Sequence, residues 1–409
     1  MNNLVIPVEV FVRDFDPRFY FSLIASDFFT VYIGEQQEIL KYIYTLKPGI
    51  YFDKSISINK NKLFRRLKGL GWKIVSIDEE GLALYTNTHK YLNHRVNNLN
   101  LPLINSFFTW SESEKKSLIE KYPNYKNKFI CTGNLRFEYC KYISMKSSVS
   151  ISKTILISSS FVGNHRLGEV GLKKLFNDLG RLEKIKDEKE YDQKRIETRI
   201  ASNKFHEFIS FLVENNPKYN FIVRPHPAEN SKNWVLLSEK FNNLKVQKPN
   251  NPIIDNFKNV SALIHSGCST AFEAHAFGLS TFYYEASDSH NISKKISVLI
   301  DENSKLSSLL NSKNVGLDKL EEFSILNSSK NTLDALTKIS LNNTSNFILR
   351  LKSILFYYYK ILIERTFNKE THKFPIKNKK LLLSYIKSKE FELGDSKLTF
   401  ISNKIIKIK

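Results

Sequence analysis

Cysteine is scarce in this chain of 409 residues, which has only Cys131, Cys140 and Cys268. They form no CxxC pair and no even-numbered framework, which argues against a disulfide-stapled secreted scaffold and favours a reducing, cytoplasmic compartment. The opening stretch, MNNLVIPVEVFVRDFD, has no basic segment followed by an apolar one. It therefore does not have the pattern of a secretory signal.

Long hydrophobic runs are also missing. The most apolar late stretch, ILFYYYKILI at 354–363, is too short to span a membrane and contains Lys360. Zinc-finger spacing, an aromatic RNA-binding motif and internal repeats are absent as well. We therefore expect no nucleic-acid partner.

Basic residues are in excess, with 62 Lys and Arg against 41 Asp and Glu, a net charge of +21. Such a balance fits anionic substrates or an anionic membrane surface, and an AT-rich genome would produce the same bias. Peripheral contact with the membrane therefore stays open. The content of 42% hydrophobic and 25% charged residues is typical of a folded protein.

The first 145 residues alternate between short apolar runs and helical patterns. Strands are predicted at 4–10, 30–34 and 72–78, and helices at 19–28 and 36–46. This alternation predicts a parallel sheet covered on both faces. We expect a Rossmann-like domain at 1–145.

A second series of strands begins with TILISSS and continues at 220–227, 244–249, 261–267 and 280–286. It predicts a second Rossmann-like domain at 150–302, and a charged, solvated helix over 180–203. The fold class is therefore α/β, with two Rossmann-like domains and a cleft between them, and ligands beyond the carboxyl ends of the strands. Residues 303–409 are predicted to be a helical, basic C-terminal region that ends in the tail ISNKIIKIK.

The tetrapeptide Arg224-Pro225-His226-Pro227 directly follows an apolar strand. Its prolines fix the backbone and hold His226 in a rigid turn. Arg224 and His226 are suited to donate hydrogen bonds to a phosphate, and we expect Pro227 to line the same site. The alternative is an ordinary turn with a surface histidine.

The segment from His265 to Thr270 joins a strand to a helix. Free backbone N–H groups at a helix start bind anions, and the segment also carries hydroxyl donors and a flexible glycine. The candidate phosphate ligands here are His265, Ser266, Gly267, Ser269 and Thr270. Glu273 is expected either to bind a ribose or to form a capping box with Thr270.

Two further turns follow strands. Asp78, Glu79, Glu80 and Gly81 form an acidic turn in which repulsion would raise a carboxyl pKa and suit it to proton transfer. The serine run Ser158–Ser160 is expected to place Ser159 and Ser160 beside the phosphate. Both patterns are also typical of ordinary solvated turns.

The chain resembles the bacterial surface carbohydrate biosynthesis proteins of capsule and lipopolysaccharide. The resemblance spans roughly 4–290 and is carried by IPVEVFVRDFD, GIYFDKSIS, IDEEGL, TGNLRFE and HSGCSTAFEA. The acidic turn, His-Pro turn and serine-rich helix start are also similar to those of Kdo transferases and bacterial sialyltransferases with the GT-B fold.

This resemblance implies transfer of a Kdo-like or sialic-acid-like sugar from a CMP-sugar donor to a glycan or glycolipid acceptor. It also implies that the domain at 1–145 binds the acceptor and the domain at 150–302 binds the donor. By the same resemblance, His226 contacts the CMP phosphate, Ser266, Ser269 and Thr270 hold it, and Glu80 or Glu79 is the reacting carboxylate. No DxD-like pair lies near the phosphate motifs, so we expect no metal or other cofactor.

Three other functions fit the same motifs. A UDP-N-acetylglucosamine 2-epimerase-like isomerase has a similar turn before a similar helix start. A CDP-glycerol glycerophosphotransferase has similar His-Pro and serine elements. A non-catalytic polyanion-binding protein would use the basic charge alone.

Overall fold

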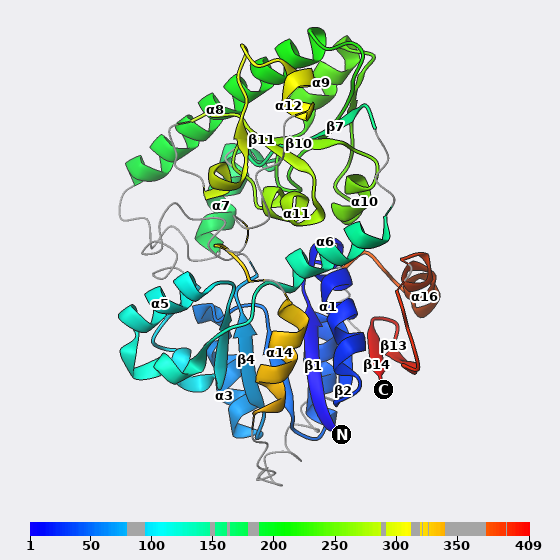
Figure 1. Ribbon diagram of the computed structural model, residues 1–409. Helices are drawn as coiled ribbons and strands as arrows, with labels where there is room; N and C mark the ends of the chain where they lie inside the picture. The colour runs from blue at the N-terminus through cyan, green and yellow to red at the C-terminus, as the bar shows by residue number, and fades with distance from the viewer. Residues whose placement is uncertain are drawn as a thin grey trace. The chain divides into compact units, whose positions relative to one another are not determined.

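The computed structural model describes residues 1–79, 95–147, 152–161, 164–178, 188–287, 292–311, 320, 322–325, 327–339, 374–389 and 391–409. By its internal contacts the chain divides into two compact units (Figure 1). The first unit combines Met1–Tyr139 with Glu321–Lys409, and the second is Cys140–Leu320. The residues after 320 thus belong to the first unit, whereas the sequence suggested a separate region at 303–409.

The first unit is built on an eight-stranded sheet of order β13-β14-β2-β1-β3-β4-β5-β6. Six of its strands are parallel: β1 (Asn2–Val8), β2 (Phe29–Glu35), β3 (Ile50–Asp53), β4 (Lys73–Ile77), β5 (Ser106–Thr109) and β6 (Phe129–Cys131). The predicted strands at 4–10, 30–34 and 72–78 are β1, β2 and β4. Because β1 lies between β2 and β3, the chain reverses its direction of progress across the sheet beside β1.

Helices of the first unit follow these strands and bury apolar faces. They are α1 (Phe11–Ala25), α2 (Gln36–Tyr42), α3 (Asn61–Gly69) and α5 (Glu112–Lys121), and α6 (Leu135–Lys146) runs from this unit into the second. The C-terminal residues of the unit add α14 (Ser328–Thr337) and α16 (Lys379–Ser388). The helix predicted at 19–28 begins earlier, at Phe11, and contains Pro17. Its stacked Phe11, Phe15 and Phe19 rings lie in the core.

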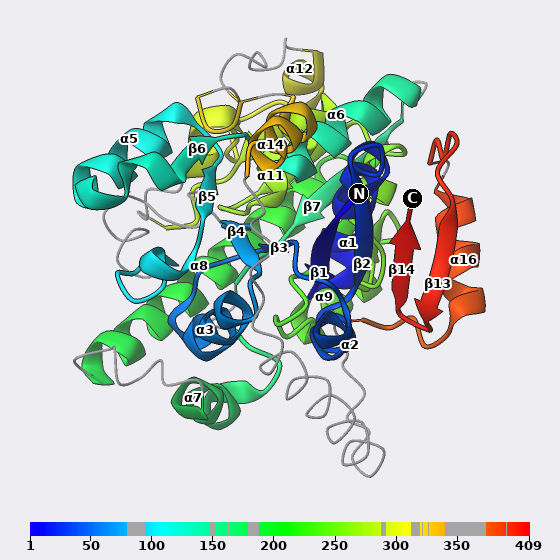
Figure 2. The same cartoon turned by 90° about the horizontal axis from the view of Figure 1, so that it is seen from below.

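The C-terminal residues extend the first sheet. Strands β13 (Leu398–Ser402) and β14 (Ile405–Ile408) form an antiparallel hairpin, and β14 pairs with β2, as Figure 2 shows at the edge of the sheet. Part of the predicted basic tail therefore forms β14, and its side chains Ile405, Ile406 and Ile408 are buried. Gly34 permits the approach, since a Cβ there would lie 2.3 Å from the Lys404 carbonyl oxygen.

The loop after β6 contacts the returning chain. Gly133 has a φ of 84°, and a Cβ there would lie 2.2 Å from the Ile325 carbonyl oxygen. The Asn134 N–H donates to Ser324 Oγ at 3.0 Å. These contacts join the segment before α14 to the carboxyl edge of the first sheet.

The second unit has a fully parallel six-stranded sheet of order β12-β11-β10-β7-β8-β9. The strands are β7 (Thr154–Ser158), β8 (Asn220–Arg224), β9 (Leu244–Val246), β10 (Ala262–His265), β11 (Ser280–Tyr283) and β12 (Val298–Leu299). All strands predicted for this domain are present. Strands β8 and β9 lie on one side of β7 and strands β10, β11 and β12 on the other, so the switch point lies between β7 and β10.

The helices of the second unit are α7 (Gly168–Asp178), α8 (Glu188–Glu214), α9 (Lys232–Lys240), α10 (Ile254–Phe257), α11 (Thr270–Phe277) and α12 (Leu306–Asn311). The charged stretch at 180–203 enters α8, and 179–187 lies outside the described residues. The second half of α8 is not solvated throughout, because Phe205, Phe208 and Ile209 pack into the core. Within the described residues, no helix is long and apolar enough to cross a membrane.

Candidate functional site

The carboxyl edge of the second sheet brings three of the predicted motifs together. Strand register places Ser158 between His265 on β10 and Arg224 on β8. The serine run, the His-Pro turn and the serine-rich helix start therefore leave the sheet side by side. This edge includes the switch point, where ligands bind in open α/β sheets.

Side chains connect the two strands that flank the switch point. Ser158 Oγ lies 3.3 Å from Cys268 Sγ, and Ser160 Oγ donates to the Gly267 carbonyl at 3.1 Å. Gly267 has a φ of 87°, a backbone conformation that a side chain would strain. These contacts hold the loop before α11 against the end of β7.

Helix α11 begins without a side-chain cap. Its N-cap residue is Ser269, whose side chain makes no capping hydrogen bond, whereas the predicted capping box placed Thr270 at the N-cap. The Thr270 N–H donates to the weak acceptor Cys268 Sγ at 3.2 Å, and the next two N–H groups, of Ala271 and Phe272, donate to the carbonyls of Cys268 and Ser269. Ser266, Ser269 and Thr270 are half-buried, so this helix start is within reach of a ligand.

The two side chains of the His-Pro turn have different surroundings. Arg224 is buried and donates to Asn256 Oδ1 at 2.9 Å and to the Asn251 carbonyl. Burial lowers its pKa, while the nearby Glu273 carboxylate acts in the opposite direction. Arg224 thus fastens the end of β8 to Asn251 and to helix α10, which differs from the direct phosphate contact expected of it.

His226 and Pro227, by contrast, are exposed. The Nδ1 atom of His226 accepts a hydrogen bond from the Ala228 N–H at 3.1 Å. This bond assigns the proton of the neutral ring to Nε2, which makes Nε2 a hydrogen-bond donor. His226 is therefore the member of the turn best suited to meet a phosphate.

His265 is fully buried and hydrogen-bonded at both ring nitrogens. Its Nδ1 accepts from the Gly267 N–H at 3.2 Å, and its Nε2 lies 2.9 Å from Ser297 Oγ. Burial lowers the pKa of His265 to about 3, so the ring is neutral. The expected contact between His265 and phosphate is not open to this side chain, which instead shapes the turn into α11.

Glu229, two residues after the His-Pro turn, is a buried hub that the sequence analysis missed. Its carboxylate accepts from Ser159 Oγ at 2.6 and 2.7 Å, from the Phe161 N–H at 3.1 Å and from Trp234 Nε1 at 3.0 Å. The Ser159 hydroxyl is therefore occupied, rather than presented to a phosphate as predicted. Only the position of Glu229 beside the turn could have signalled this role.

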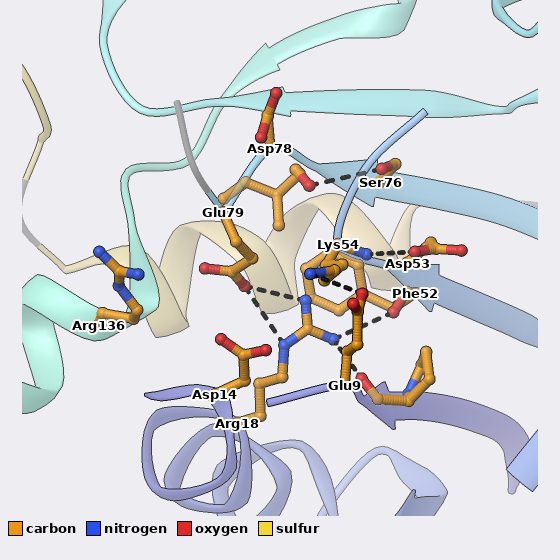
Figure 3. A network of polar contacts seen from close by, with 12 residues as sticks. Glu9, Asp14, Arg18, Phe52, Asp53, Lys54, Ser76, Asp78, Glu79 and Arg136 are labelled. Atoms are coloured by element: carbon orange, nitrogen blue, oxygen red, sulfur yellow. Dashed lines mark hydrogen bonds and ion pairs between the residues drawn. The ribbon is translucent and has the colours of Figure 1, made fainter. Parts of the chain in front are cut away.

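In the first unit, Asp78 and Glu79 follow β4 and point to opposite sides (Figure 3). Asp78 accepts two bonds from Arg95, both at 2.8 Å, and Glu79 accepts from Arg18 Nη2 at 2.9 Å. Each carboxylate thus faces its own arginine, which differs from the expected repelling cluster. Glu80 and Gly81 lie outside the described residues.

The same edge carries charged residues that the sequence analysis did not single out. They are Glu9 after β1, Asp14 and Arg18 on α1, Lys54 after β3, and Arg136 on α6 (Figure 3). Glu9 and Asp14 lie in IPVEVFVRDFD, and Arg18 lies two residues after it. Lys54 lies in GIYFDKSIS and Arg136 in TGNLRFE, so these three segments converge in space (Figure 3). The signal available in the sequence was a charged residue directly after each of two apolar strands.

Asp14 closes the start of α1. Its Oδ2 accepts the Val10 N–H at 3.1 Å. Burial alone would raise the pKa of Asp14, but Arg13, Lys54 and Arg18 together hold it well below its usual range. The start of α1 therefore holds a carboxylate of the chain.

Among the residues that the structure describes, no three His, Cys, Asp or Glu side chains form a group that could hold a metal ion. The three cysteines are not bonded to one another. Metal independence stays a prediction.

Comparison with solved structures identifies the fold. UDP-GlcNAc 2-epimerase from Neisseria meningitidis, bound to UDP-GlcNAc, matches with a TM-score of 0.50 and 14% identity over 83% of this chain and 100% of that chain. The Methanocaldococcus jannaschii enzyme, in complex with UDP-GlcNAc and UDP, matches with a TM-score of 0.50 and 13% identity over 82% and 99%. The chain therefore has a two-domain α/β fold of the GT-B-like type.

No family model matches the chain. No curated protein matches it either.

Proposed function

We propose that this chain is an enzyme acting on a nucleotide-activated sugar, with the nucleotide phosphate bound at the carboxyl edge of the second sheet. The observation that carries the proposal is the uncapped start of α11 beside the β7–β10 switch point. Backbone N–H groups and the helix dipole favour an anion there. Ser266, Ser269 and Thr270 add hydroxyl donors within reach of solvent.

The corresponding position of the first unit supports this assignment by contrast. There the Asp14 carboxylate accepts the Val10 N–H at the start of α1, and its negative charge would repel a phosphate. Of the two sheet edges, the second is therefore better suited to the nucleotide. In this proposal His226 donates through Nε2 to the phosphate, and Glu273 accepts from the ribose.

Two reactions fit the proposal. An isomerase acting on a UDP-sugar is supported by the fold likeness, which covers 82% and 83% of this chain. Transfer from a CMP-activated Kdo-like or sialic-acid-like donor to a glycan acceptor, at the inner face of the membrane, is supported by the convergence of the resembling segments in the first unit. The structural comparisons favour the isomerase, which we place first.

A nucleotide panel tests the binding proposal. We expect one of CMP, CDP, UDP and GDP to stabilise the protein selectively, by about 2.7 kcal/mol at 100 times its Kd. The variant His226→Ala should bind that nucleotide about tenfold more weakly, since it loses a charge-assisted hydrogen bond. Lys232→Ala, at an exposed lysine near the same turn, should leave binding unchanged. If no nucleotide raises the melting temperature, the proposal is wrong.

Solvent isotope exchange separates the two reactions. Inversion at C2 of a sugar requires the C2–H bond to break, so an isomerase incubated with UDP-GlcNAc in D₂O incorporates deuterium at C2. A transferase incorporates none and instead releases CMP from a CMP-sugar when an acceptor is present. Mass spectrometry of the recovered sugar, together with nucleotide analysis, distinguishes the outcomes.

A further inference from the structure

Arg18 connects three strand ends in the first unit (Figure 3). Its Nη1 donates to the Pro7 carbonyl of β1 at 3.0 Å and to the Phe52 carbonyl of β3 at 3.4 Å. Its Nη2 and Nε donate to Glu79 Oε1, after β4, at 2.9 and 3.3 Å. One guanidinium therefore fixes the carboxyl ends of β1, β3 and β4.

Both partners of this ion pair are almost fully buried, with side-chain exposures of 1% for Arg18 and 4% for Glu79. Removing two charges from water is unfavourable, and apolar residues of similar volume often stabilise a core as well or better. Stabilisation of the fold alone is therefore a weak explanation for the presence of this buried ion pair. The planar guanidinium supplies what an apolar group does not, which is several hydrogen bonds in fixed directions.

The strand ends that Arg18 joins include those of β1 and β3, which flank the switch point of this sheet. Glu9 and Lys54 meet there in an ion pair of 2.7 Å, with side-chain exposures of 26% and 11%. They are more accessible than the Arg18–Glu79 pair. A carboxylate that accepts and an ammonium that donates are together suited to the hydroxyl groups of a sugar.

We propose that Arg18 is a positioning residue for a sugar-binding site formed by Glu9 and Lys54, and that Glu79 is a fixed anion rather than a proton-transfer group. This inference rests on the proposed function, since it assigns a sugar taking part in that reaction to these two side chains. Glu79 acts by holding the Arg18 side chain in place, since its Oε1 accepts both hydrogen bonds between the two residues.

The test compares Arg18→Met, Arg18→Lys and Glu79→Gln with the unaltered full-length chain. Turnover is measured with UDP-GlcNAc by C2 exchange and with a CMP-sugar by CMP release, and nucleotide Kd is measured in parallel. Misplaced groups commonly reduce turnover a hundredfold. We expect Arg18→Met to lower kcat by about that factor, with the nucleotide Kd changed less than about threefold, because binding of the nucleotide belongs to the second unit.

The other variants separate geometry from charge. Arg18→Lys retains the positive charge but cannot reach three acceptors at once, so kcat should still fall about tenfold. Glu79→Gln retains an oxygen acceptor for Arg18, and its kcat should fall less than tenfold. Leu67→Ala, in the buried face of α3, controls for lost stability and should keep kcat near that of the unaltered chain.

Three results would overturn the inference. A thousandfold loss in Glu79→Gln would make Glu79 a proton-transfer group, and unchanged kcat in Arg18→Lys and Arg18→Met would remove the positioning role. If Leu67→Ala lost as much kcat as Arg18→Lys at a matched loss of melting temperature, the fall in kcat would be explained by lower stability and not by positioning. Absence of nucleotide binding by the unaltered chain would instead refute the proposed function, and the inference with it.

Discussion

Replacing Glu229 with alanine is expected to destabilise the second unit by about 3–5 kcal/mol, since three buried donors would lose their acceptor. These are the Ser159 hydroxyl, the Phe161 N–H and the Trp234 indole N–H. Each unsatisfied buried donor costs about 1–3 kcal/mol, and local relaxation recovers part of the sum. The melting temperature of this unit should fall by roughly 10 °C.

The matched control is Glu239→Ala, which removes the same group from an exposed position on α9. It should change stability by less than about 0.5 kcal/mol. Chemical denaturation of both variants provides the comparison. Equal stabilities would show that the Glu229 contacts add nothing. If Glu229→Ala loses stability as expected, its affinity for the nucleotide should also fall, because this carboxylate connects Ser159 to the His-Pro turn.

The architecture of the second unit could be predicted because each strand has a clear local sequence pattern. Runs such as ILIS, FIVR and ALIH are apolar and end at serine, arginine or histidine. Parallel pairing then places those end residues at one edge, and the register confirms it for Ser158, Arg224 and His265. The sequence therefore predicted that the loops after these strands lie side by side, and that they form a binding site stays a prediction.

The individual roles could not be predicted because they depend on partners distant in sequence. Arg224 is held by Asn256, 32 residues away, and Ser159 by Glu229, 70 residues away. Arg18 lies 61 residues from Glu79. A sequence motif shows which hydrogen-bonding groups are present, but burial decides whether they face a ligand or one another. His226 stays a strong candidate because its turn leaves it exposed.

The terminal hairpin was missed for a similar reason. ISNKIIKIK has a strong basic character, and its alternation IIKI is only four residues long. Its stability as a strand comes from pairing with β2, more than 350 residues earlier in the chain. Tertiary contact overrides weak local signals of this kind.

Acid is expected to destabilise the second unit through His265. Its Nε2–H donates to Ser297 Oγ, because the Ser297 hydroxyl donates in turn to the Ser293 carbonyl at 2.9 Å. Its Nδ1 accepts from the Gly267 N–H. A second proton, at Nδ1, would set two donors against each other in a fully buried position.

Burial lowers the pKa of His265 from 6.5 to about 3. Because the folded pKa lies below the unfolded one, the unfolded state binds a proton first as pH falls, and stability is lost between pH 6.5 and about 3. At 1.36 kcal/mol per unit of pKa shift, the loss is about 3 kcal/mol by pH 4 and about 4 kcal/mol by pH 3. Above pH 6.5 this contribution is fully present.

The variant His265→Gln isolates this effect from the protonation of carboxylates. Its amide oxygen can accept from Gly267 and its amide nitrogen can donate to Ser297, but it does not titrate. The free energy of unfolding of His265→Gln, measured by denaturant titration from pH 7 to pH 4, should therefore fall by about 3 kcal/mol less than that of the unaltered chain. His226→Gln, at an exposed histidine, should keep the full pH dependence. Parallel curves for His265→Gln and the unaltered chain would contradict the prediction, because they would show that protonation of His265 does not destabilise the fold.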